Sequence, residues 1–263
     1  MANSTYLYVS PHLDDAILSV GGLISAQLRV GDRVVIGTVC TADAPSGEPL
    51  SPLAIDVHQR WGNPHAPYER RRREDIAACL ALGGAEYRHL GLPDAIYRRN
   101  PDSTQYRYET FEELFGPIPT WDQAFSVSVA ATINRLVAEL QPRMVFGPLG
   151  VGRNVDHLHV RNAVLRMPDL PSVGFYEDQP YSTGRYPLVA PDSVNVAVRT
   201  CPVPLRPKTH VVDLAVKTDA IQYYKSQLTE LFGPAHAGIE AMADYSRTLA
   251  EERGSVERVW YTE

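Results

Sequence analysis

Segments typical of buried strands alternate with segments typical of amphipathic helices along most of this chain, and this alternation limits the possible folds more than any other feature. Tyr6–Ser10 has the pattern of a short buried strand. Apolar residues then recur at intervals of three or four from Ile17 to Leu28, which predicts a helix. Gly31 breaks that helix, and Arg33–Val39 is rich in the β-branched residues of strands. A strand, a helix and a second strand in succession indicate a parallel sheet covered by helices.

The alternation continues and predicts a Rossmann-like α/β fold, an open and mostly parallel sheet flanked by helices, with short extra strands near the C-terminus. In the most regular helix, Trp121–Leu140, Thr120 and Gln123 have the spacing of a capping box. We find no repeat or linker, so we expect residues 1–263 to form a single domain. The other predicted elements are a helix over Tyr68–Leu82, strands at Tyr87–Leu90 and Met144–Gly147, a helix from His157, strands at Val173–Tyr176, Val194–Arg199 and His210–Leu214, a helix over Ala215–Leu231 and a strand near Val259.

The composition is that of an ordinary globular protein and argues against several functions. A net charge of −6 argues against binding to nucleic acid. The run Arg70–Arg73 is flanked by acidic residues, so most of it is expected to be a solvated helix face with internal ion pairs. No apolar segment approaches the ~20 residues of a membrane span, and no secretory signal is recognised. The three cysteines suggest neither disulfides nor a cysteine zinc site, so we expect a cytoplasmic protein; its oligomeric state cannot be read from the sequence.

Three polar residues, His12, Asp14 and Asp15, directly follow the first predicted strand. Ligands of open α/β sheets bind outside the carboxyl ends of the strands, where the strand order reverses. Because His12 and Asp15 are three positions apart across a strand-to-helix turn, both can reach one point, an arrangement suited to zinc. Asp14 is then left to hold a proton. The alternative is that Asp14 or Asp15 simply caps the following helix.

A second polar motif follows the fourth predicted strand and opens a helix, so it lies at the same edge of the sheet. It contains Asn154, Asp156 and His157. His157 can complete a set of two histidines and one carboxylate that leaves a position open for water, as in catalytic zinc sites. Fe²⁺ or another divalent metal is an alternative, because oxygenases bind Fe(II) with the same ligands. Asp156 can orient an imidazole or cap the helix, whereas His159 is expected to point away.

With PHLDDA and NVDH at these two places, the chain resembles the LmbE-like (PIG-L) N-acetylglucosaminyl de-N-acetylases. Arg71 with Glu74, and the segment Tyr176–Tyr181, match as well, so the resemblance covers nearly the whole chain. It implies a zinc-dependent hydrolase that removes an N-acyl group, in particular N-acetyl, from an amino sugar or small glycoconjugate. The roles it implies are Zn²⁺ ligands for His12, Asp15 and His157, and the general base for Asp14.

Five residues are candidates for contact with the substrate. The resemblance suggests Arg71, Glu177 and Tyr181, and Asp156 joins them as a neighbour of the metal motif. Tyr97 lies in a long, tyrosine-rich connection, where its ring either lies against a sugar or packs the loop onto the body.

One position departs from the family pattern. Many relatives have a histidine three residues before the distal zinc ligand, where this chain has Asn154. An asparagine amide can donate a hydrogen bond to an oxyanion but cannot transfer a proton. Either Asp14 serves as both base and acid, or another histidine compensates, for which His210 is the candidate.

The expected reaction is attack by a zinc-activated water on an amide, with Asp14 taking the proton and returning it to the leaving amine. Two alternatives stay open, a non-catalytic relative that binds metal or sugar, and an amidase for a non-sugar N-acyl metabolite. A nucleotide-binding Rossmann enzyme is disfavoured because Gly21 and Gly22 lie within a helix rather than in a turn after a strand.

Overall fold

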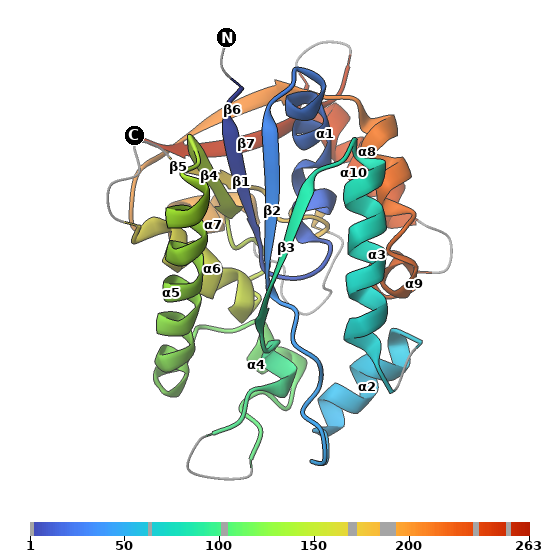
Figure 1. Ribbon diagram of the computed structural model, residues 1–263, viewed down its shortest axis with the longest axis vertical. Coiled ribbons are helices and arrows are strands. Elements are labelled where there is room, and N and C mark those ends of the chain that lie inside the picture. The colour runs from blue at the N-terminus through green and yellow to red at the C-terminus, as the bar shows by residue number, and fades with distance from the viewer. Residues whose placement is uncertain are drawn as a thin grey trace.

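The computed structural model describes residues 3–62, 65–100, 105–167, 173–184, 193–233, 237–250 and 254–263. In these residues the strands form one sheet in the order β3-β2-β1-β4-β5-β7-β6 (Figure 1). The first five strands are parallel, and β7 runs antiparallel to both β5 and β6. The strands are β1 (Thr5–Ser10), β2 (Arg33–Cys40), β3 (Glu86–Leu92), β4 (Met144–Pro148), β5 (Val173–Tyr176), β6 (Leu205–Val211) and β7 (Val256–Thr262).

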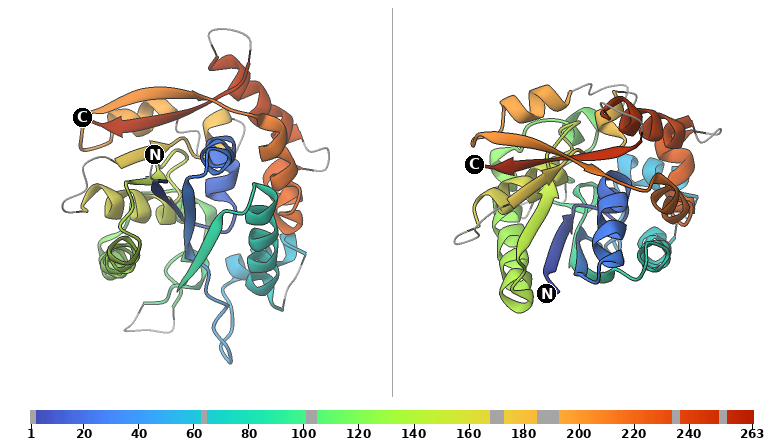
Figure 2. Two further views of the ribbon diagram at one scale, coloured as in Figure 1. Left: turned by 45° about the horizontal axis from the view of Figure 1, so that its top comes forward. Right: turned by 90° about the horizontal axis from the view of Figure 1, so that it is seen from above.

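Helices cover both faces of the sheet, α1, α3 and α8 on one face and α5 and α6 on the other (Figures 1 and 2). The α-helices are α1 (Asp15–Arg29), α2 (Pro52–Arg60), α3 (Pro67–Ala81), α4 (Phe111–Leu114), α5 (Gln123–Leu140), α6 (Val155–Leu165), α7 (Val194–Arg199), α8 (Leu214–Ile221), α9 (Lys225–Phe232) and α10 (Ala237–Thr248). Short 3₁₀ helices occur at Ala95–Tyr97, Thr120–Asp122 and Tyr181–Thr183.

The central strand β1 is buried on both sides, as its apolar sequence predicts. Leu7 and Val9 pack into the cluster beneath α5 and α6, and Tyr8 packs into the cluster beneath α1 and α3. Successive side chains of a strand point to opposite faces, so one short strand contributes to both cores. The Tyr8 ring stacks on Phe146 of β4, with the centroids 4.4 Å apart.

The order of the strands reverses between β1 and β4. The chain passes from β1 outward to β2 and β3, and then returns to place β4 and β5 on the other side of β1. Connections that leave two neighbouring strands in opposite directions open a crevice at their carboxyl ends. The residues after β1 and β4 therefore face one crevice, as predicted.

The predicted α/β fold is confirmed, with four corrections near its edges. Val194–Arg199 is the helix α7, because its buried residues Val194 and Ala197 recur at helical spacing. The predicted strand His210–Leu214 begins earlier, as β6. Ala215–Leu231 is two helices, because the chain turns where buried Tyr224 bonds Asp75 at 2.8 Å. Thr120 starts a 3₁₀ turn, and α5 has no side-chain cap, so the capping box is absent.

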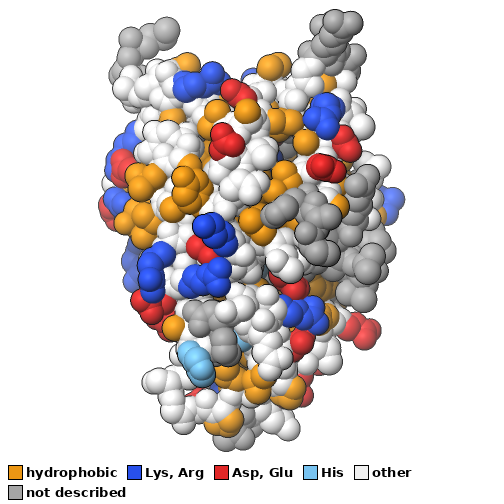
Figure 3. Space-filling view, turned by 90° about the vertical axis from the view of Figure 1, so that its right-hand side faces the viewer, with side chains coloured by type: hydrophobic (Ala, Val, Ile, Leu, Met, Phe, Trp, Pro, Cys, Tyr) orange, Lys and Arg blue, Asp and Glu red, His pale blue; other side chains and the backbone are white. Residues whose placement is uncertain are grey.

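The arginine run on α3 is mostly an exposed, paired surface, as expected. Arg70 pairs with Glu74 at 2.9 Å, and Arg73 pairs with Glu69 at 2.5 Å. On the face shown in Figure 3, basic side chains lie beside acidic ones. Cys40, Cys79 and Cys201 are free thiols. In the described part of the chain, no helix is long and apolar enough to cross a bilayer.

Candidate functional site

Hydrogen bonds within the turn that follows β1 stabilise its conformation. Ser10 Oγ donates to the carbonyl of His12 at 2.7 Å and accepts from the amide of Ala16 at 3.1 Å. The amide of Asp14 also donates to the carbonyl of His12, at 3.0 Å. These bonds hold His12, Asp14 and Asp15 in a compact turn at the start of α1, so the three side chains enter the crevice from fixed positions.

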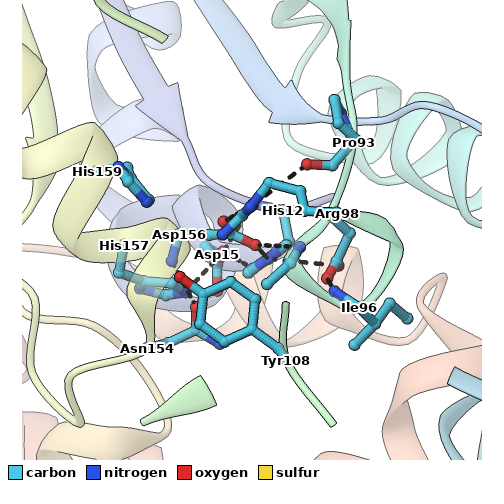
Figure 4. Close-up of polar contacts among 12 residues, drawn as sticks. His12, Asp15, Pro93, Ile96, Arg98, Tyr108, Asn154, Asp156, His157 and His159 are labelled. Carbon is cyan, nitrogen blue, oxygen red and sulfur yellow. Dashed lines mark hydrogen bonds and ion pairs between the residues drawn. The ribbon is translucent and has the colours of Figure 1, made fainter. Parts of the chain in front are cut away.

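His12, Asp15 and His157 converge on one point, as Figure 4 shows. Their ligand atoms all lie within 4.8 Å of one another. Asp15 Oδ2 is 3.1 Å from His12 Nδ1 and 3.2 Å from His157 Nε2. Two imidazole nitrogens and one carboxylate oxygen are a donor set that suits zinc.

In each of these two histidines, the ring nitrogen that faces away from the convergent point (the outer nitrogen) contacts a carboxylate. His157 Nδ1 lies 2.6 Å from Asp178 Oδ1, and His12 Nε2 lies 3.1 Å from Asp156 Oδ2 (Figure 4). A proton on each outer nitrogen leaves the inner nitrogen with a lone pair for a metal, the usual arrangement around metal-binding histidines. His157 Nε2 is buried and, apart from its 3.2 Å contact with Asp15 Oδ2, has no polar partner among the described residues, so the donor set fits a metal ion.

The electrostatic field at this point favours positive charge. Burial alone would lower the pKa of His157, but Asp15 and Asp178 outweigh it and raise the pKa to about 9. Burial would raise the pKa of Asp15, yet His157 and His12 hold it well below its usual value. Carboxylates that stabilise a proton on an imidazole also stabilise a divalent cation there.

Asp14 lies beside the donor set as a nearly buried carboxylate. Its side chain is 5% exposed and lies 3.6 Å from the Arg71 guanidinium. Burial raises the pKa of Asp14 to about 6, with Arg71 opposing the shift and Asp15 adding to it. A carboxyl group of this kind is suited to exchange protons near neutral pH.

His12, Asp14, Asp15 and Arg71 line one cavity of about 90 Å³. Its polar lining also includes Asp94 and Asn154. Its aromatic lining includes Trp61, Phe115 and Tyr181. The Arg71 guanidinium lies over the Trp61 ring, 4.4 Å from its centroid, so this charge is held between an aromatic ring and Asp14.

Residues 7–167 match the sequence profile of the GlcNAc-PI de-N-acetylase (PIG-L) family. The chain belongs to this family. It is 34% identical to a 2'-N-acetylparomamine deacetylase of Streptomyces fradiae over 181 residues, which are 68% of this chain but only 58% of that protein. A 2'-N-acetylparomamine deacetylase of Niallia circulans is 27% identical, over 87% of this chain and 82% of its own length.

A solved structure similar to this PIG-L family chain is the zinc-inhibited form of teicoplanin deacetylase Orf2. The TM-score is 0.84 at 28% identity, and the match covers 99% of this chain and 98% of the other. The predicted family is thereby confirmed. At the level of the family, so is the predicted class of enzyme, an N-deacetylase, which is an amide hydrolase.

Two of the predicted residues around the metal donors lie at the cavity, and a third lies behind it. Arg71 is the member of the arginine run that points inward. Tyr181 packs edge-on against His157, with the centroids 5.5 Å apart. Asp156 lies behind His12 and is 1% exposed, so it holds the imidazole and does not line the cavity.

Asn154 both caps a helix and lines the cavity. Its Oδ1 caps α6 by accepting from the amide of Asp156 at 2.9 Å, and the residue also lines the cavity. The capping bond occupies the carbonyl end of the side chain, which leaves its NH₂ group as a hydrogen-bond donor.

Three other predicted site residues in this PIG-L family chain do not line the cavity. His210 lies on β6, where its Nε2 is 2.9 Å from the Tyr261 hydroxyl. Glu177 accepts hydrogen bonds from Tyr245, Arg258 and Trp260 behind the sheet edge. Tyr97 is 3% exposed and bonds His58 at 2.5 Å, so it packs the loop onto the body. The expected roles of His210 in proton transfer, and of Glu177 and Tyr97 in binding, find no support in these positions.

Sequence reasoning named Asp156 as a residue that can orient an imidazole, and it contacts His12, but it missed the support of His157 and the residues behind Asp156. Asp178 follows β5 at the same sheet edge and also accepts from the amides of Gly150 and Val151, so the rule that located His12 would have found it. Arg98 and Asp122 had no such signal. Arg98 Nη1 lies 2.5 Å from Asp156, and its other terminal nitrogen lies 3.1 Å from Asp122. His159 is a buried residue bonded to Asp122 at 3.0 Å, away from the metal donors as expected (Figure 4).

Proposed function

We propose that this chain is a zinc-dependent N-deacetylase that hydrolyses the acetamide of an N-acetylated amino sugar carried by a larger small molecule. The observation that carries the proposal is the position of Asp14, a buried carboxyl group next to the convergent set His12, Asp15 and His157. A metal donor set alone is common to many enzymes. A second carboxyl that is free to exchange a proton beside it is what amide hydrolysis requires.

Zinc would be held by His12 Nδ1, a carboxylate oxygen of Asp15 and His157 Nε2. When bound there, it supplies a Lewis acid that polarises the amide carbonyl and makes water more acidic. Asp156 and Asp178 keep the two imidazoles in the tautomers that this binding needs.

Asp14 accepts the proton of the attacking water and then donates it to the leaving amine. An amine must be protonated as it leaves, and Asn154 cannot supply a proton. With His210 away from the cavity, we assign both steps to Asp14, the carboxyl group directly beside the convergent set. The Asn154 amide donates a hydrogen bond to the oxyanion that forms on the substrate.

The proposed substrate class is inferred from the substrates for which the relatives are named and from the residues that line the cavity. The curated relatives are named for 2'-N-acetylparomamine and the structural relative for teicoplanin. Arg71 lies at the cavity with its guanidinium held on Trp61, and we assign it to hydrogen bonds with the sugar. Tyr181 offers a ring on which a sugar face can pack.

A panel of N-acetylated amino sugars, free and within aminoglycoside or glycopeptide compounds, tests the function. Zinc-loaded protein is expected to release acetate and a free amine from at least one of them, and a chelator is expected to abolish the release. A second set of N-acetyl compounds without sugars serves as the comparison. Hydrolysis of the sugar-free compounds alone would contradict the proposed substrate, and zinc binding without hydrolysis of any compound would contradict the proposed activity.

A further inference from the structure

A second and larger cavity lies on the other side of the loop that carries Asn154. It has a volume of about 380 Å³ and is lined by residues of α5, α6 and α7, which lie together on one side of the molecule (Figure 1), and of the segments 117–118 and 150–153. Small-molecule sites have volumes of about 300–1,000 Å³, so this space suits a small ligand. Arg153 lines this cavity while its neighbour Asn154 lines the metal-site cavity, so one loop forms part of both walls.

The lining of this second cavity is basic. It contains Arg153, Arg161 and Arg166, and among the described residues it contains no aspartate or glutamate. Its remaining polar side chains are uncharged amides and hydroxyls, those of Gln123, Ser126, Asn162 and Thr200. Guanidinium groups keep their charge at all ordinary pH values, so the positive charge cannot be removed by deprotonation.

Arg161 is partly buried and has no carboxylate partner among the described residues. Its guanidinium lies 3.4 Å from the carbonyl of Leu149 and 3.4 Å from Asn162 Oδ1. Burial lowers the pKa of Arg161; Cys201 and Asp178 oppose this shift, and the charge of Arg153 adds a smaller lowering effect.

The buried arginines elsewhere in the described chain are paired differently. Arg98 has a carboxylate oxygen at 2.5 Å, and Arg71 has one at 3.6 Å. A partly buried guanidinium that lacks such a partner is stabilised when an anion enters beside it.

We propose that this cavity binds the anionic group of a small molecule, a carboxylate or a phosphate monoester, on Arg161 and Arg166. The planar guanidinium fork matches the oxygens of either group. The anion belongs either to a separate effector or to an acidic part of the substrate itself.

The proposed site is connected to the metal centre by a short series of contacts. Arg161 Nη1 bonds the Leu149 carbonyl, and the next two amides, of Gly150 and Val151, donate to Asp178 at 2.8 and 2.9 Å. Asp178 in turn holds His157. Occupation of the cavity therefore acts on the loop that fixes one of the metal donors.

Calorimetric titration of the zinc-loaded protein with inorganic phosphate tests the site. The double variant Arg161→Gln/Arg166→Gln is expected to bind phosphate at least about tenfold more weakly than the wild type, because two charge-assisted contacts are lost. The control Arg135→Gln/Arg206→Gln removes the same charge from exposed positions outside the cavity and is expected to bind like the wild type. Phosphate that reaches the metal affects all three proteins alike. Equal affinity in the cavity variant, or no binding to the wild type, would overturn the proposal.

Kinetics with a neutral and an acidic substrate distinguish the two sources of the anion. An effector changes kcat or KM for the neutral substrate in the wild type and in the control, but not in the cavity variant. If the anion is part of the substrate, phosphate raises KM for the acidic substrate only, and the cavity variant has a raised KM for that substrate alone. The titration does not depend on the proposed deacetylase activity, so failure of one proposal is distinguishable from failure of the other.

Discussion

The two metal-donor histidines are positioned by buried carboxylates that are themselves held by other charged groups. One carboxylate oxygen of Asp156 contacts His12, and the other accepts a hydrogen bond from Arg98. The Arg98 guanidinium lies 4.0 Å from the centroid of the Phe125 ring. Asp122, fully buried, lies beyond Arg98 and also accepts from Tyr108 at 2.8 Å. The geometry of His12 thus depends on residues that are distant in sequence.

Replacing Arg98 by methionine tests this dependence. The change leaves Asp156 and Asp122 buried without their shared cation, which we expect to cost about 3–5 kcal/mol in the free energy of unfolding. Urea denaturation gives the value. Arg206→Met, which breaks an exposed ion pair with Glu263, is the control and is expected to cost about 0–1 kcal/mol. Equal costs for the two variants would mean that Arg98 does not neutralise the buried pair.

The sequence predicted the residues of the candidate metal site better than most of the residues that hold them in place. His12, Asp15 and His157 were found because each lies just after a strand or at the start of the helix that follows it, where position in the chain determines position in space. Arg98 escaped prediction because its role depends on how the long connection after β3 folds back onto α6. His210 was placed wrongly because a histidine near a strand carries no sign of the sheet edge at which that strand lies.

At the scale of elements, α1 shows why two adjacent glycines lie within a helix. The helix has a non-helical residue at Val20, and the amides of Gly22 and Leu23 after it donate to Glu257 of β7 at 3.1 and 2.8 Å. Lys217 of α8 pairs with Glu257 at 2.9 Å. The break in α1 is therefore closed by a carboxylate from the far end of the chain.

The two glycines are expected to respond differently to alanine. A Cβ at Gly22 would lie 2.7 Å from Val212 Cβ, so Gly22→Ala should destabilise the protein by about 1–3 kcal/mol. A Cβ at Gly21 would lie 3.3 Å from Lys217 Cγ and at ordinary contact distances of 3.4 and 3.6 Å from Ile17 and Leu82, so Gly21→Ala should be nearly neutral, since alanine also favours helix. Thermal unfolding of both variants measures the difference. A larger loss for Gly21→Ala would contradict this packing.

The elements that the sequence predicted best are those inside the sheet. Strands β1, β2, β4 and β5 are apolar because helices cover both faces, so their composition alone marks them. The segment of α7 is rich in valine and was taken as a strand, but it packs as a short helix at the edge of the molecule. The intrinsic β propensity of valine does not determine the conformation of this segment, because tertiary contacts select it.

At the scale of the whole molecule, the metal donors connect the two halves of the sheet. His12 and Asp15 follow β1, and His157 follows β4, on either side of the point where the strand order reverses. A metal bound by both motifs would join segments that are separated by more than half of the chain, so metal binding and folding would be coupled.

Zinc is accordingly expected to raise the stability of the folded chain. At a free zinc concentration of about 100 times Kd, the gain should be about 2.7 kcal/mol, visible as a higher Tm than in chelator. His157→Asn should abolish most of the shift, while Arg135→Gln, an exposed change on α5, should keep it. An equal shift in His157→Asn would mean that zinc binds elsewhere.

In the proposed reaction, Asp14 carries the proton beside a metal that it does not hold, and no other assignment is as central to the activity. Turnover and zinc content of Asp14→Asn, measured together on a substrate hydrolysed by the wild type, test it. We predict about one zinc per chain and a fall in kcat of about 10²–10⁴-fold, the usual loss when a general acid–base group is removed. Turnover near that of the wild type with zinc bound would contradict this role of Asp14.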